Sequence, residues 1–122
     1  MKKLTTLALA LVLSACASIQ NPVSRNQLYG IEAAYGVALS AAVGYRNLPL
    51  CHRGESPTLY NICAQRSVIL ALQAADRKAE VAIAEANDFV RNYPTLNAAQ
   101  AIQAASNAVA AFNQIESANN IN

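Results

Sequence analysis

Three stretches of the chain repeat their apolar residues at alternating intervals of three and four, the spacing of one face of an α-helix. The first comprises Leu28, Ile31, Tyr35, Ala38, Ala42 and Tyr45. The second comprises Val68, Leu72, Ala75, Ala79, Ala82, Ala86 and Phe89. The third comprises Ala98, Ile102, Ala105, Val109 and Phe112, and continues to either Ile115 or Glu116. Alanine, the residue with the highest helix propensity, occurs 26 times. The pattern therefore predicts an all-α protein.

Capping signals and prolines place the three helices at about 24–47, 57–92 and 97–117. Each start has a side chain that can accept a hydrogen bond from the first turn: Ser24, Ser56 before Pro57, and Asn97. The first two helices end ahead of Pro49 and Pro94. We expect residues 118–122 to form a disordered tail.

Short links between amphipathic helices favour antiparallel neighbours. The sequence therefore predicts an up-down-up three-helix bundle over residues 24–117. Its core would be filled by the larger side chains, namely Leu28, Tyr35, Leu72, Phe89, Val109 and Phe112.

Cys51 and Cys63 flank a segment rich in turn-forming residues. An even pair of cysteines in an oxidising compartment indicates a disulfide, which would close the link between the first two helices. A metal or redox site is the alternative. His52 is the only histidine, and its place beside Cys51 is a poor spacing for a tetrahedral site.

The N-terminus has two lysines followed by an apolar run that is too short to span a bilayer and is typical of a secretory signal. The run ends in Leu13-Ser14-Ala15-Cys16, which resembles the lipobox of bacterial lipoproteins. This resemblance implies a signal peptide at 1–15, cleavage after Ala15 and a lipid on Cys16. Ordinary secretion, with cleavage before Ser18, is the alternative.

The same resemblance implies a place in the cell envelope. Ala17 after the lipidated cysteine favours the outer membrane, with the protein facing the periplasm. Two or three acyl chains would anchor it stably, through a short tether at 16–23. Removing the two lysines of the signal leaves seven basic residues (9 − 2) and seven acidic ones. This zero net charge gives no reason to expect nucleic-acid binding or a polybasic membrane patch.

No set of residues in the sequence has the composition of a catalytic site, because His52 lacks a recognisable nucleophile and orienting partner. We therefore expect neither enzymatic activity nor a cofactor. Asp76 drifts onto an apolar stripe, which suggests either a buried functional acid or a pair with an arginine or a tyrosine hydroxyl. Gly30 and Gly44 lie on one stripe of the first predicted helix. Either another helix or lipid approaches closely there, or the spacing arises by chance.

These features favour a non-enzymatic envelope lipoprotein that binds a protein partner or stiffens a complex. Tyr29 and Tyr60 are expected to be exposed, where tyrosine is useful at interfaces. The stretches 70–78 (LALQAADRK) and 89–95 (FVRNYPT) resemble small helical proteins of unassigned function from alphaproteobacteria and their phages. That resemblance implies an alternative role in superinfection exclusion or host-cell lysis, which neighbouring phage genes would support.

Overall fold

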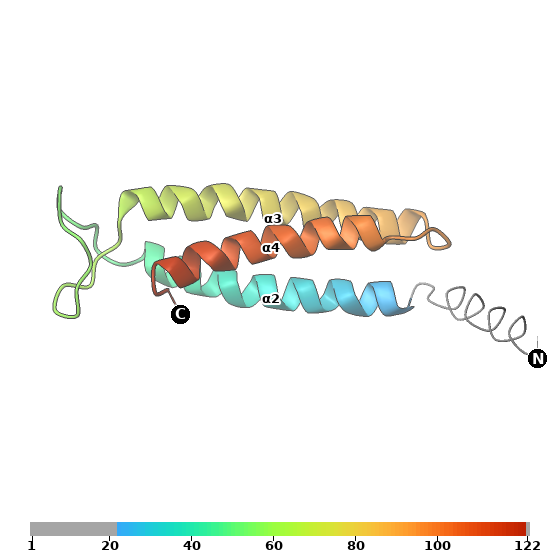
Figure 1. Cartoon of the computed structure of the whole chain (residues 1–122), viewed down its shortest axis with the longest axis horizontal. Coiled ribbons are helices and arrows are strands. Elements are labelled where there is room, and N and C mark those ends of the chain that lie inside the picture. Colours follow the sequence, from blue (N-terminus) through green and yellow to red (C-terminus); the bar gives the residue numbers. More distant parts are fainter. Residues whose placement is uncertain (1–21, 122) are drawn as a thin grey trace, which may run out of the picture.

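The computed structural model describes residues 22–121, and they form an all-α, up-down-up bundle of three helices, as predicted (Figure 1). The helices are α2 (Pro22–Arg46), α3 (Arg66–Asn92) and α4 (Ala99–Ala118). Each contacts the other two. None of these helices is both long and apolar enough to cross a membrane.

The predicted signal peptide at 1–15 and Cys16 lie outside the described residues, as does most of the predicted tether at 16–23. The tether was predicted to end at residue 23, but α2 already begins at Pro22. Proline is favoured in a first helical turn, where its missing N–H has no partner to lose. Ser24 therefore lies inside the first turn rather than at the predicted cap.

The predicted start of the second helix at residue 57 is wrong, because α3 begins at Arg66. The chain between the helices is held out of helical geometry by contacts on either side of the Cys51–Cys63 disulfide. Gln65, the residue before α3, is itself extended. The Ser56-Pro57 pair, which resembled a helix start, lies in the loop.

The third helix starts at Ala99, two residues later than predicted, and Asn97 accepts a hydrogen bond from the Ala99 N–H at 2.9 Å. At the other end the predicted disordered tail is wrong as far as Ile121. The Ile121 N–H donates to the Glu116 carbonyl and the Asn120 N–H to the Ser117 carbonyl, which is a Schellman cap. Asn120 has the positive φ (53°) that this cap requires, and Ile121 is buried.

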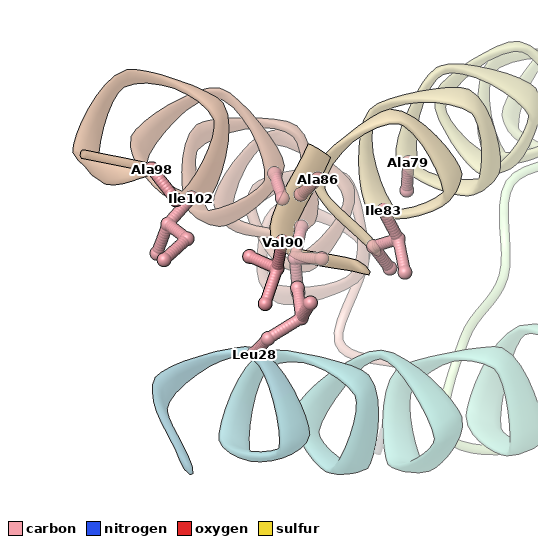
Figure 2. Packing of buried hydrophobic residues seen from close by; sticks show 9 residues of the cluster. Leu28, Ala79, Ile83, Ala86, Val90, Ala98 and Ile102 are labelled. Atoms are coloured by element: carbon pink, nitrogen blue, oxygen red, sulfur yellow. The ribbon is translucent and has the colours of Figure 1, made fainter. Parts of the chain in front are cut away.

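The core consists of two clusters, one towards each end of the bundle. Figure 2 shows the first cluster, in which Leu28 of α2 points towards Val90 of α3. Ile102 of α4 belongs to the same cluster. The second contains Leu72, Phe112 and the capping residue Ile121. Phe112 is fully buried and lies 6.2 Å from the ring centre of Tyr35, which is half-buried. Of the large residues predicted to fill the core, Phe89 is also only partly buried, while the rest are fully inside.

Candidate functional site

The link between α2 and α3 is a loop with a covalently closed neck. Cys51 and Cys63 form the predicted disulfide, with their Cα atoms 4.9 Å apart. Beside it, the Cys51 N–H donates to the Ala64 carbonyl at 3.0 Å, and the Ala64 N–H donates to the Pro49 carbonyl at 2.8 Å. Cys63 and Ala64 are buried against the end of the bundle. We call residues 51–63 the disulfide loop.

Tyr45, in the last turn of α2, connects the bundle to the residue that follows the disulfide loop and its neck. Its ring is buried, and its hydroxyl accepts a hydrogen bond from the Gln65 N–H at 2.9 Å. This bond satisfies the backbone of the residue that precedes α3, where the helix offers no partner of its own. The last turn of α2 therefore positions both ends of the disulfide loop.

The interior of the disulfide loop is ordered by two tight turns. The first runs from His52 to Glu55 and has Gly54, with a φ of 86°, at its third position. That conformation favours glycine. The Glu55 carboxylate holds the turns together, since it accepts from the His52 N–H at 3.2 Å and from the Asn61 amide at 3.5 Å.

The second turn is a hairpin tip. Thr58 and Asn61 exchange both backbone hydrogen bonds, and the Thr58 hydroxyl accepts a third bond from the Asn61 N–H. Leu59 and Tyr60 are the two residues left at the tip. Their side chains are 94% and 101% exposed, so neither makes any protective contact with its own chain.

The exposed apolar residues at the tip continue towards the neck. Leu50 and Ile62 are 50% and 66% exposed, so four large apolar residues with substantial exposure lie at the tip and the neck. Two fully exposed apolar side chains on an ordered loop are costly in water unless something covers them. The tip therefore holds the two most exposed large apolar residues of the described chain.

The disulfide loop projects beyond one end of the bundle. Figure 1 shows it in green, at the end opposite to the blue start of α2 and to the link between α3 and α4. A helix of 25 residues such as α2 is about 37 Å long. The loop tip and Pro22 are thus separated by the full length of the bundle.

Asp76 forms the structural pair that was one of its two predicted roles. The Tyr35 hydroxyl of α2 donates to the Asp76 carboxylate of α3 at 2.6 Å. Burial raises the pKa of the Tyr35 hydroxyl, and the hydrogen bond to Asp76 and the charges of Asp76 and Glu80 raise it further. The Tyr35 hydroxyl therefore stays protonated near neutral pH, and its hydrogen bond joins α2 to α3.

Glu116 is a buried acid on α4 that was not among the candidate functional residues of the sequence. It is 7% exposed, and its Oε1 atom has no hydrogen-bond partner within the described residues. Burial raises the pKa of this carboxyl above its ordinary value. It lies in the last turn of α4, where the helix dipole also disfavours a negative charge.

The residues considered for chemistry are not brought together. His52 lies on the exposed surface of the disulfide loop, and the sulfurs of Cys51 and Cys63 are used by each other. Within residues 22–121, no group of three histidine, cysteine, aspartate or glutamate side chains could hold a metal ion.

No family model, no curated protein and no solved structure matches this chain. The site therefore has to be understood from its own geometry. Tyr60 was expected to be exposed, and it is. Leu59 was missed, although its signal was present: an apolar pair between Thr58 and Asn61, both good turn residues, inside a short disulfide loop.

Proposed function

We propose that this protein is a lipid-anchored envelope protein that acts without catalysis, as an interaction module. The lipid would be carried by Cys16, in the outer membrane, and the bundle would face the periplasm. The disulfide loop would bind a protein partner through Leu59 and Tyr60. The observation that carries the proposal is the full exposure of these two side chains on a loop that is otherwise tightly constrained.

The position of the loop along the bundle supports this assignment. Pro22 is six positions after Cys16, a span of at most about 20 Å even in an extended chain. The start of α2 would therefore stay near the membrane surface. The tip, one bundle length away, would be presented to proteins of the periplasm rather than to the membrane that holds the anchor.

The rigidity of the loop supports binding as well. Binding costs free energy when flexible residues become ordered, and a preformed loop avoids much of that cost. Tyrosine is among the residues that contribute most at interfaces, because it combines a large apolar surface with a hydroxyl. The partner would need an apolar pocket that admits adjacent leucine and tyrosine side chains.

Photo-crosslinking in native membranes tests the proposal. A photoreactive phenylalanine analogue at Tyr60 should capture one protein species, and reduction of the disulfide should abolish the capture. Tyr93 is the matched control, since it is 53% exposed and lies at the opposite end of the bundle. It should not capture that species.

Two results would count against the proposal. Capture of lipid alone at Tyr60 would mean that the tip inserts into a membrane. Equal capture from Tyr60 and Tyr93, or no change in capture from position 60 when Leu59→Ser is introduced beside the photoreactive residue, would mean that the tip is not the binding element.

A further inference from the structure

A second surface, on the side of the bundle formed by α2 and α4, differs from the disulfide loop in shape and composition. Two shallow grooves lie along it. One is lined by Gly30, Ala34, Ser106 and Ala110 among others, and the other by residues that include Val37 and Gly44. Both grooves are bordered by α2, one on its α4 side and one towards the C-terminal cap. We call this surface the α2–α4 face.

The grooves of the α2–α4 face contain no charged side chain. The single charged residue of α4 is the buried Glu116. In contrast, α3 carries eight of the fourteen charged residues of the described chain: Arg66, Asp76, Arg77, Lys78, Glu80, Glu85, Asp88 and Arg91. Ordinary solvation of a bundle would spread charges over all of its outer faces. α2 carries three more, Arg25, Glu32 and Arg46, and none of them lines either groove, so the two grooves differ from the charged remainder of the surface.

The small residues of α2 are not explained by packing within the chain. A Cβ atom added at Gly30 or Gly44 would meet no atom within 4 Å. Each glycine costs about 1 kcal/mol relative to alanine in a helix, so the bundle alone gains nothing from them. Val37, between them on the outer surface of α2, is 74% exposed. Glycines on either side of an exposed valine allow the backbone of another helix to come close.

We propose that a second copy of this chain packs against the α2–α4 face. An uncharged surface is complementary to itself, because two copies that meet through it bury no charge without a partner. Side-chain amides at its rim, such as those of Gln27, Gln103 and Asn113, can pair across a two-fold axis. A partner with a charged surface would find no opposite charge here.

The area of the face is of the order that a stable dimer needs. Two helices side by side are about 20 Å wide, and α4, with 20 residues, is about 30 Å long. The planar footprint is therefore about 600 Å² per copy, of the same order as the roughly 800 Å² that each partner buries in a stable interface of standard size.

The proposed dimer goes beyond the role of the disulfide loop and does not depend on it. A two-fold axis parallel to the helices would place both starts of α2 at one end and both loops at the other. Such a dimer is compatible with two anchors in the same membrane, and it would display two tips towards the partner.

Matched valine substitutions test the dimer in the full-length protein extracted from membranes in detergent. Val81 is the control for Val37, because it is 57% exposed on α3, away from the α2–α4 face. We expect light scattering to report a dimer for the wild type and for Val81→Glu. Val37→Glu should raise the dimer dissociation constant at least about tenfold, since two carboxylates would face each other.

A crosslinking experiment makes the test independent of how well Val37→Glu folds. In native membranes, Val37→Cys should form a dimer with a short thiol-to-thiol crosslinker, and Val81→Cys should not. A wild type that is monomeric at all concentrations would overturn the proposal. So would equal weakening by both glutamates, or crosslinking of Val37→Cys only to a different protein. Capture at Tyr60 is measured separately, so failure of the dimer leaves the role of the loop open to its own test.

Discussion

Glu116 is the residue whose environment is least compatible with its charge. Its carboxyl is buried in the last turn of α4, and one of its oxygens lacks a hydrogen-bond partner within the described chain. Burial raises the pKa of this group, so folding favours its protonated form. The contribution of Glu116 to stability is therefore fully present below the ordinary pKa of 4.5 and is lost as pH rises through the raised value.

Glu116→Gln should remove this contribution to the pH dependence, because glutamine does not titrate. We expect the free energy of unfolding of the wild type to fall more steeply than that of the variant as pH rises from 4.5 towards neutrality. Glu116→Leu should stabilise the protein at neutral pH by about 1 to 3 kcal/mol, the usual cost of a buried polar group without a partner. Urea denaturation at a series of pH values measures both. Parallel pH profiles for the wild type and Glu116→Gln would contradict this account.

At the scale of the element, we expect replacement of glycine by alanine to have opposite effects on stability at two positions. Gly36 lies within α2 with open space around it and outside both grooves, so Gly36→Ala should stabilise the protein by about 0.5 to 1 kcal/mol. Gly54 has a φ of 86°, so Gly54→Ala should destabilise the disulfide loop by roughly 1 kcal/mol. Thermal unfolding followed by circular dichroism compares the two. A change in stability of the same sign for Gly36→Ala and Gly54→Ala would contradict either the helix-propensity argument or the turn-geometry argument.

Removal of the disulfide should affect the loop and the bundle differently. Cys51→Ser together with Cys63→Ser opens a segment of twelve residues and should lower the free energy of unfolding by roughly 3 kcal/mol. The three helices should persist, since they are held by the two core clusters. Helical content by circular dichroism and hydrogen exchange of the loop amides would show this. Loss of the helices at room temperature would mean that the disulfide holds the fold itself.

The helices could be predicted from sequence because their apolar spacing records their buried faces. Leu28, Leu72, Val109 and Phe112 were assigned to the core by this spacing alone, and all four are buried. The start of α3 could not be placed in the same way. Ser56-Pro57 has the chemistry of a helix start, but the disulfide and the hydrogen bonds of Ala64 hold that segment in another conformation. Contacts distant in sequence decided the outcome there.

The C-terminal cap was missed for a different reason. Its signal was local and present, since Asn120 tolerates a positive φ and is followed by the apolar Ile121. A short polar end was interpreted as disorder, although the apolar residue within it had a place in the second core cluster. The apolar tip of the disulfide loop could be foreseen only in part, because its exposure depends on how the loop closes.

At the scale of the whole molecule, three surfaces differ in composition. Most of the charged residues lie on α3, the grooves of the α2–α4 face are lined by none, and the two most exposed large apolar residues lie at the loop tip, at the end opposite to the start of α2. A protein held at one end, with a partner at the other and a second copy alongside, would use all three surfaces.

The proposed attachment through Cys16 is central, because it would give the molecule its orientation. Intact mass spectrometry of the mature protein from native membranes tests it most directly. We predict a chain that begins at Cys16, carries a diacylglycerol and a further acyl chain, and lacks the two hydrogens lost when Cys51 and Cys63 pair. A mature chain that begins at Ser18 and carries no lipid would contradict the account.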